Sequence, residues 1–563
     1  MLTGLFSVLL PSLLLLPRNT NAGRTLTSPL GPVVDLGYAA YAGNTTSPTG
    51  VESGPVTFFG NIPYAQPPLW ELRFRAPRML NERAVTSHVD DARGWGPPCI
   101  QRPAVVGIGT EDCLKLNIWK PTNATEGDKL PVTVYIHGGG FYYNSPQGFP
   151  MNTWVAQHPG GVLGVSMAYR MSLFGFLGGS AVAADGDLNT GLLDQRAALE
   201  WIQRHIAKFG GDPDNVTIYG ESAGGASVVM QLVAYGGSKP VPFKRVTAQS
   251  IGFGPTRTQD QIEAAFASAA AFAGCPTSGK EAMACLRSAS VGALVSAVNR
   301  VPNGAFALVI EGLSGFLPDL PSRLVAAGKF SQVDFVGGHC TGDGKSFTAG
   351  KPQDVNTEDD LRKAVFSRWP GVSNATIAKA LALYPAPGAP GSPFATQYDR
   401  ASTMAGEIVF TCMDWFVAES LLAKGAKNVF SYTWNAPDPA IYATTPYRGA
   451  AHTSDIYYLF EGTNPFGNAG NTFTPFNTSE AALASEAIAY WTSFAATGDP
   501  SSMKKQASPT WDTFVSSENA RRRLMLERGS DTATNSGMEN VTAAEIERCR
   551  FWMSEEVTAE TRI

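Results

Sequence analysis

Two periods of apolar residues alternate along the first half of the chain. Short apolar runs of strand length occupy residues 131–136 (PVTVYI), 161–167 (GVLGVSM) and 215–220 (NVTIYG). Residues 191–211 have helical spacing and end at two glycines, and residues 223–235 (AGGASVVMQLVAY) predict a further helix. The apolar stripe of the first helix comprises Leu193, Ala197, Trp201, Ile202 and Phe209. Strands that alternate with helices predict an α/β fold with a large, mostly parallel sheet flanked by helices on both faces.

The rest of the pattern gives no sign of a division into separate parts. The segment richest in proline and glycine, YPAPGAPGSPF (Tyr384–Phe394), separates helical patterns and is typical of a surface loop. No internal repeat and no long low-complexity linker interrupts the sequence. Its 563 residues would allow several domains, although large α/β folds often exceed the usual domain length.

The N-terminus carries a separate apolar segment, Leu2–Pro17, followed by Arg18. It is shorter than the roughly 20 residues that span a bilayer, and Pro11 interrupts it. Ala22 is a small residue suited to a cleavage site. We therefore expect a cleavable signal peptide over residues 1–22 rather than an uncleaved anchor, and hence a secreted protein. No other segment approaches membrane-spanning length.

Sequons and cysteines agree with export. The N-x-[ST] tripeptides that are candidates for N-glycosylation begin at Asn44, Asn123, Asn215, Asn374, Asn477 and Asn540. Seven cysteines should pair in an exported chain and leave one over. Cys99 with Cys113, and Cys275 with Cys285, would each close a short loop, although spacing alone proves neither pair.

Charge and cysteine spacing exclude two classes of ligand. The net charge is −5 and there is no basic tract, so nucleic acid is not an expected partner. There is no C-x-x-C, so no metal site is expected.

Ser222 lies in GESAG, between a predicted strand and a predicted helix. A G-x-S-x-G elbow holds a nucleophilic serine on a strained turn, and Gly220 and Gly224 leave room for neighbouring backbone. The alternative is a small residue in a turn that needs small residues. The HGGG at residues 137–140 favours a nucleophile, because the N–H groups of its glycines and of Ala223 can bind an oxyanion.

The order serine, acid, histidine that is typical of such folds leaves two candidates for the base, His339 and His452. His205 falls in the predicted helix and is interpreted as structural. His339 lies only four residues before the best acid, which leaves no room for an intervening strand and helix. His452 follows a loop of small residues and is the preferred base.

Asp343 is the preferred acid. An apolar strand reaches Val336, and a glycine-rich loop that contains Asp343 follows. A carboxylate there can accept the second imidazole N–H and fix the tautomer. Asp334 lies inside the strand, and Asp455 is only three residues past the histidine. The nearby GKS resembles the end of a phosphate-binding loop, but the required glycine is replaced by histidine, so no nucleotide site is expected.

These motifs, with others along the chain, resemble the type-B carboxylesterase/lipase family of large α/β-hydrolases, which includes cholinesterases and fungal lipases. The matching stretches are GNIPYAQPP, RFRAP, EDCLKLNIW, IHGGGF, AYRMSLFGFL, residues 189–225, GAAHTSDIYYLF and ATGDP. The resemblance implies one α/β-hydrolase domain over residues 23–563. It also implies the following roles: Ser222 as nucleophile, His452 as base, and Gly139, Gly140 and Ala223 as oxyanion donors.

The resemblance further implies a disulfide pattern. It pairs Cys99 with Cys113, Cys275 with Cys285 and Cys412 with Cys549, and leaves Cys340 free beside the acid.

Two departures from the family bear on function. The family usually has glutamate where this chain has Asp343, and a shorter acid can do the same electrostatic work if its loop advances. The loop between Cys99 and Cys113 holds 13 residues and no tryptophan. Interfacial lipases have a longer lid there, and cholinesterases have a tryptophan that stacks on choline, so both activities are disfavoured.

The sequence therefore predicts a secreted serine hydrolase of carboxylic esters that forms an acyl-enzyme on Ser222 and needs no cofactor. Its partner is a small-molecule ester, either short- to medium-chain or from secondary metabolism. The alternatives are a lipase for long-chain acylglycerols or sterol esters, amide cleavage by the same residues, and a non-catalytic binding or adhesion protein. Relatives that only bind lose the serine or the histidine. Phe141, Tyr142 and Phe316 are candidates for the pocket lining or for packed aromatic residues.

Overall fold

The computed structural model describes residues 26–45, 56–83, 85–252, 254–466, 470–515 and 520–563. The expected signal peptide, residues 1–22, lies outside this part of the chain. Among the described residues no single helix has the length and apolar character to cross a membrane, although the bent pair Gly279–Ser288 and Val291–Arg300 meets that test together.

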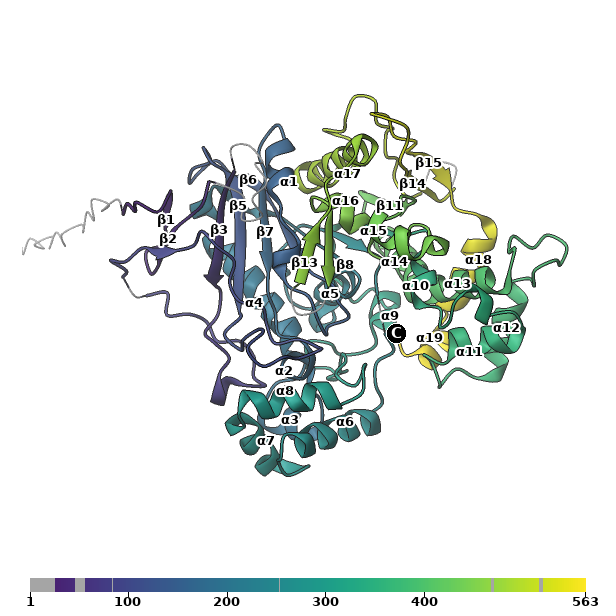
Figure 1. The fold of residues 1–563 in the computed structure, drawn as a ribbon, viewed down its shortest axis with the longest axis horizontal. Coiled ribbons are helices and arrows are strands. Elements are labelled where there is room, and N and C mark those ends of the chain that lie inside the picture. Colours follow the sequence, from purple (N-terminus) through teal and green to yellow (C-terminus); the bar gives the residue numbers. More distant parts are fainter. Residues whose placement is uncertain (1–25, 46–55, 84, 253, 467–469, 516–519) are drawn as a thin grey trace, which may run out of the picture.

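A ten-stranded sheet forms the centre of the fold (Figure 1). Its strands run in parallel from β14 to β7, and antiparallel pairs close both edges. The prediction of a large, mostly parallel sheet is confirmed. In spatial order the strands are β15 (Gly537–Asn540), β14 (Arg522–Leu526), β11 (Val429–Trp434), β10 (Asp334–Cys340), β9 (Arg245–Gln249), β8 (Gly211–Glu221), β6 (Leu130–Ile136), β7 (Leu163–Met167), β5 (Lys115–Pro121) and β3 (Val56–Pro63).

Alternation along the central strands divides the interior into two cores. In β6, Val134 and Ile136 point into one core, whereas Tyr135 points into the other, because successive strand residues face opposite sides. Helices α4 (Thr190–His205), α5 (Ala223–Val233) and α14 (Cys412–Ala423) contribute to the first core. Helices α1 (Asn152–Gln157), α16 (Ser454–Leu459) and α17 (Thr478–Thr497) cover the second. Both faces are therefore buried, as a parallel sheet requires.

Two groups of helices lie beyond the carboxyl ends of the central strands (Figure 1). One contains α6 (Gln259–Phe272), α7 (Gly279–Ser288) and α8 (Val291–Arg300). The other contains α10 (Asp343–Phe347), α11 (Glu358–Phe366), α12 (Asn374–Leu383), α13 (Gln397–Gly406), α18 (Ala543–Trp552) and α19 (Glu555–Thr561). The proline-rich segment Tyr384–Phe394 connects α12 to α13 without helix or strand, as predicted.

The described chain contains the three disulfides that the resemblance implied, Cys99–Cys113, Cys275–Cys285 and Cys412–Cys549. The last ties α18 to α14 across the second group of helices. Cys340 is free and buried at the end of β10.

Two local expectations need correction. In α4, Leu193 and Ala197 are only half-buried, whereas Leu192, Ala198 and Leu199 are buried, so the packed face is wider and rotated. β10 continues past Val336 to Cys340, because β11 pairs with it through Trp434. Asp343 then begins the short helix α10 instead of lying in a glycine-rich loop. Pairing between parallel strands outweighs the low strand propensity of the two glycines in β10.

Candidate active site

Ser222 stands on the turn between β8 and α5, in a backbone conformation with φ of 60° and ψ of −122°. Such a positive φ is rare for a residue other than glycine, and the surroundings must hold it in place. The Ser222 N–H donates to the Gln249 carbonyl at 3.0 Å. A side chain at Gly224 would come within 2.0 Å of the Ile136 carbonyl oxygen, so only glycine lets α5 start this close to β6.

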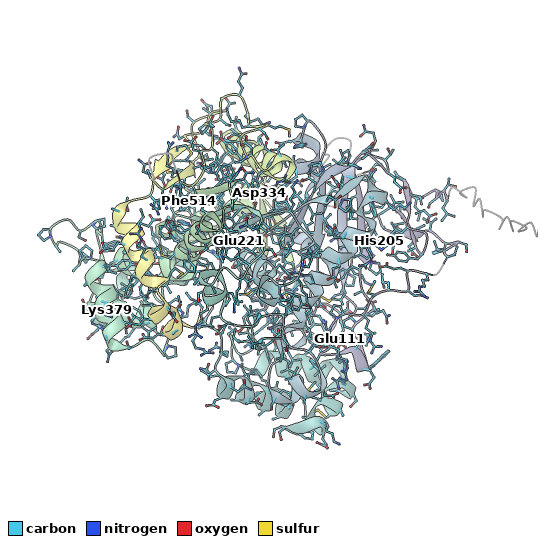
Figure 2. The ribbon with its side chains drawn as sticks, turned by 180° about the vertical axis from the view of Figure 1, so that it is seen from behind. Glu111, His205, Glu221, Asp334, Lys379 and Phe514 are labelled. Carbon is cyan, nitrogen blue, oxygen red and sulfur yellow. A yellow bond between two sulfur atoms is a disulfide. The ribbon has the colours of Figure 1, made fainter. Side chains whose placement is uncertain are left out.

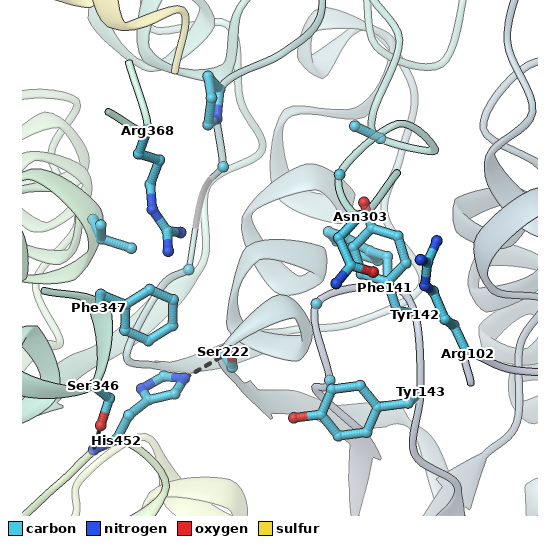
Figure 3. Close-up of a pocket in the computed structure, with 18 of the residues that line it drawn as sticks. Arg102, Phe141, Tyr142, Tyr143, Ser222, Asn303, Ser346, Phe347, Arg368 and His452 are labelled. Atoms are coloured by element: carbon cyan, nitrogen blue, oxygen red, sulfur yellow. Dashed lines mark hydrogen bonds between the residues drawn. The ribbon is translucent and has the colours of Figure 1, made fainter. Parts of the chain in front are cut away.

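His452 and Asp343 complete a hydrogen-bonded chain with Ser222 (Figure 3). His452 Nε2 lies 2.9 Å from Ser222 Oγ, and His452 Nδ1 lies 2.7 Å from Asp343 Oδ1. A backbone bridge between Gly342 and Ala451 aligns the loop before α16 with the start of α10. The structure thus brings together the preferred serine, base and acid, which come from three distant parts of the sequence.

The other carboxylate oxygen of Asp343 is held from behind. Ser250 Oγ donates to Oδ2 at 2.8 Å, and the Cys340 N–H donates to the same atom at 3.0 Å. Oδ1 therefore faces His452, where it accepts the Nδ1 proton and leaves Nε2 as the acceptor toward Ser222. No feature of the sequence pointed to Ser250.

Two aromatic rings hold the His452 imidazole. The Phe410 ring lies 4.6 Å from it, and the Phe347 ring meets it edge-on at 5.0 Å. Phe410 belongs to a π-helical turn, Glu407–Thr411, between α13 and α14. Such turns are uncommon and often occur at functional sites. Here the turn places Phe410 against the imidazole and Val409 on the wall of the adjoining cavity.

Glu221, the residue before the serine, is a second carboxylate beside the base. Its Oε1 lies 3.2 Å from His452 Nε2, and it is buried near the centre of the molecule (Figure 2). Burial raises the pKa of Glu221, while the charge of His452 lowers it less. Burial lowers the pKa of His452, but the charges of Glu221 and Asp343 together raise it above its usual value. Glu221 is visible in the motif, but its contact with a histidine 231 positions later is not.

Three backbone N–H groups surround the space in front of Ser222. Gly139 and Gly140 have φ of 104° and 63°, conformations that suit glycine. Within the described residues, the N–H groups of Gly139, Gly140 and Ala223 donate to no protein acceptor. They are therefore available to an oxyanion formed at the serine. His137 has another role: burial lowers its pKa to about 4, and its neutral ring stacks on Tyr169 at 4.5 Å.

The remaining candidate residues are bound elsewhere. His339 pairs with Asp414 on α14 at 2.8 Å, and His205 lies 3.1 Å from Glu82 and packs against Trp201. Asp455 accepts from Gln249, Tyr432 and Cys340 in the interior. None of these three side chains makes a hydrogen bond to Ser222 among the described residues. In the described part of the chain, no cluster of three His, Cys, Asp or Glu side chains is arranged to hold a metal ion.

A cavity of about 1160 Å³ opens in front of the serine (Figure 3). Phe141 and Tyr142 line it, together with Tyr143, residues of the segments that precede α6 and follow α8, and residues of α10 and α11. Phe316 does not: its ring packs on Tyr235 at 5.2 Å, so it is a packed aromatic residue. The cavity lies beyond the carboxyl ends of the parallel strands, where α/β sheets commonly bind ligands.

A parallel sheet with helices on both faces, together with a serine on a strained strand-to-helix turn and a histidine and an aspartate in hydrogen-bond contact, defines an α/β-hydrolase. A sequence model of the Carboxylesterase family matches residues 31–552. The chain belongs to this family, and it is a carboxylic ester hydrolase.

Similar proteins include fungal lipases and an esterase of known structure. A secreted lipase of Arthroderma benhamiae is 31% identical over 548 residues, which cover 91% of this chain and 94% of the relative. Lipase 1 of Geotrichum candidum is 32% identical over 466 residues, 73% of this chain and 81% of the relative. The crystal structure of Aspergillus niger EstA superposes with a TM-score of 0.81 at 29% identity, covering 95% of this chain and 99% of EstA.

Proposed function

We propose that this protein is a secreted serine esterase whose nucleophile, base and acid are Ser222, His452 and Asp343. The continuous contact from Asp343 through His452 to Ser222, at the floor of an open cavity, is the observation that carries the proposal. One α/β-hydrolase domain extends over residues 23–563 after removal of the signal peptide 1–22.

In the reaction, Ser222 Oγ attacks the ester carbonyl while His452 Nε2 accepts its proton. The oxyanion that forms accepts hydrogen bonds from the N–H groups of Gly139, Gly140 and Ala223. His452 then protonates the departing alcohol and leaves an acyl-enzyme. Water repeats the cycle, with His452 again as the base. Asp343 stabilises the imidazolium in both halves and stays ionised.

The substrates we propose are short- or medium-chain esters, or esters of secondary metabolism. The short loop Cys99–Cys113 supports this choice, because it is small for a lid that closes over the cavity.

A lipase is the second candidate, and one observation favours it. The same loop lines the cavity with Arg102 and Pro103 and then exposes Val105, Val106 and Ile108 to solvent. Val106 is 68% exposed. Apolar side chains at the rim of a site are suited to a lipid interface, and fungal relatives carry the name lipase.

Secretion is supported by three disulfides and by relatives that are named secreted lipases. Among the sequons, Asn123, Asn374, Asn477 and Asn540 are exposed and accessible to glycosylation. Asn44 and Asn215 are half-buried, and the amide of Asn215 donates to the Ala496 carbonyl at 3.3 Å.

The test is hydrolysis of p-nitrophenyl esters from acetate to palmitate by the secreted protein and by Ser222→Ala. We expect kcat/KM to be highest for short chains and to fall by about 10⁵–10⁶-fold in the variant. A long-chain preference that rises once substrate forms an interface would favour the lipase. Rates equal to those of Ser222→Ala on every ester would favour the non-catalytic alternative.

A further inference from the structure

The wall of the cavity carries an arginine that the reaction above does not use. We infer that Arg368 binds an anionic group of the substrate, and that the preferred esters carry a carboxylate several bonds away from the ester bond. This inference rests on the proposed function, since it names the substrate class of the same site. It is carried by the position of the guanidinium, by its lack of a protein counter-charge and by the other charges of the cavity.

Arg368 follows α11, just after the C-cap residue Ser367, and both residues line the cavity. Its guanidinium carbon lies 4.8 Å from the centre of the Phe347 ring, and the same ring packs edge-on against His452 at 5.0 Å. Because both distances are measured to the centre of the Phe347 ring, the guanidinium carbon lies at most about 10 Å from the centre of the imidazole. Figure 3 shows it above Phe347, on the His452 side of the cavity, with Arg102 on the opposite side.

No carboxylate in the described part of the chain balances this charge. Among the described residues, Arg368 makes no ion pair and no hydrogen bond, and its side chain is exposed toward the cavity. The surrounding protein still removes enough water for burial to lower the pKa of the guanidinium, which stays protonated. The guanidinium is thus partly desolvated, and a bound anion would supply the counter-charge that it lacks among the described residues.

A purely structural role explains less. A cation near a helix C-terminus often hydrogen-bonds the last carbonyls, but Arg368 donates to none of the described carbonyls and lies on an aromatic ring instead. The two other arginines of the cavity show the contrast. Arg102 donates to the Val298 carbonyl at 3.0 Å, and Arg257 donates to the Gly304 carbonyl at 2.7 Å.

The geometry suits a carboxylate in particular. The guanidinium lies over the Phe347 ring, and its N–H groups, which donate to none of the described residues, are available for two parallel bonds to a planar anion. Glu221 is the one carboxylate among the described residues that line the cavity, and it lies beside Ser222. When this carboxylate is ionised, it disfavours a second negative charge next to the ester carbonyl. The anion therefore belongs at the far end of an acyl or alcohol chain, where Arg368 lies.

The experiment compares matched pairs of p-nitrophenyl esters. In the first series, each substrate is the p-nitrophenyl monoester of a linear dicarboxylic acid with four to eight carbons. Each monoester is compared with an ester of the same chain length whose free carboxylate is replaced by a neutral primary amide. A second pair places the carboxylate or the amide on the alcohol of an acetate ester. Each preference is the ratio of kcat/KM for the anionic ester to that for the neutral one.

We expect the wild type to prefer one anionic series by about 10- to 100-fold, as for a hydrogen bond to a charged group, and the preference to weaken as salt rises. Arg368→Gln should lower that ratio at least tenfold, and Arg368→Lys should restore part of it. Arg362→Gln is the matched control, because Arg362 lies on α11, pairs with Glu358 on the surface and does not line the cavity. Its ratio should equal that of the wild type.

Equal ratios in the wild type and Arg368→Gln would overturn the inference, as would the same fall in Arg362→Gln, which would indicate a general charge effect. These outcomes differ from a failure of the proposed function. In that case the neutral esters would also be hydrolysed no faster than by Ser222→Ala.

Discussion

Two largely buried histidine–aspartate pairs lie in and just beyond β10, and only one of them belongs to the candidate site. His339 on β10 meets Asp414 of α14 at 2.8 Å, and His452 meets Asp343 at 2.7 Å. Measured by distance and burial, the two pairs are nearly alike. In both, a neighbouring carboxylate raises the pKa of the imidazole above its usual value although burial lowers it.

The pairs differ in what lies beyond them. His452 Nε2 faces Ser222 Oγ and the cavity, whereas His339 has neither a nucleophile nor the cavity within reach. The free oxygen of each aspartate differs too. Asp343 Oδ2 accepts two hydrogen bonds, but Asp414 Oδ1 accepts none from the described residues. A histidine–aspartate pair is thus a common structural element, and the groups at its two ends decide whether it can do chemistry.

The largest effect is expected when each histidine is replaced with alanine. His452→Ala should lower kcat/KM for a short-chain ester by about 10⁴–10⁶-fold, because Ser222 loses its base. His339→Ala should change kcat/KM less than tenfold. It should instead lower the free energy of unfolding by about 3–5 kcal/mol, because Asp414 is left buried without its partner. The measurements are steady-state kinetics at 20 °C and urea unfolding of both variants.

The two readouts separate the pairs only if each variant is folded in the assay, so circular dichroism is recorded on the same samples. A folded His339→Ala protein that loses activity as completely as His452→Ala would contradict the assignment of the base.

The sequence predicted the parts of the site that depend on local pattern and chain order. The elbow around Ser222 follows from a strand, small residues and a helix in succession. The order serine, acid, histidine left His339 and His452 as candidates, and the four-residue spacing of His339 from Asp343 favoured His452. Asp343 was identified although α10 begins there, because the candidate acid only had to follow the strand. The mostly parallel sheet was predicted from short apolar runs of strand length that alternate with segments of helical spacing.

The rest depends on contacts between distant segments, which no local pattern records. The approach of Glu221 to His452 joins the end of β8 to the segment before α16, and Ser250 reaches Asp343 from the end of β9. Arg368 and Phe347 come from neighbouring segments, but only the fold turns both toward the cavity. Phe316 shows the converse, since an aromatic residue near a predicted site packs against Tyr235 instead.

A smaller effect should follow from the second carboxylate, since among the described residues His339 makes an ion pair with Asp414 alone. Glu221→Gln removes a carboxyl group that lies 3.2 Å from His452 Nε2. In its ionised form this group raises the pKa of the imidazole, so that pKa should fall in the variant. The base must be neutral to accept a proton, so the acid limb of kcat/KM against pH should move to lower pH by about one unit. At pH values below the limb the variant should then be about tenfold faster than the wild type, relative to each plateau.

The profile is measured from pH 4.5 to 9.5 with a neutral ester. Glu71→Gln removes a carboxylate of the same kind from the surface and should leave the limb where it is. A limb that moves to higher pH, or one that stays fixed in Glu221→Gln, would show that Glu221 does not hold the proton on His452.

The smallest effect concerns the support behind Asp343, for which Asp414 has no counterpart among the described residues. Ser250→Ala removes the hydrogen bond that Ser250 Oγ donates to Asp343 Oδ2 at 2.8 Å and leaves the one from the Cys340 N–H. We expect kcat to fall about fivefold, as for one hydrogen bond of about 1 kcal/mol, with KM nearly unchanged, because the aspartate is less firmly oriented but still ionised. Ser493→Ala is the matched control, since Ser493 is equally buried, accepts a hydrogen bond from the Met503 N–H and lies on α17 away from the site. A fall in kcat shared by both variants would reflect a general loss of packing. A fall confined to Ser250→Ala would show that the hydrogen bond on Asp343 Oδ2, which Asp414 Oδ1 lacks among the described residues, contributes to catalysis.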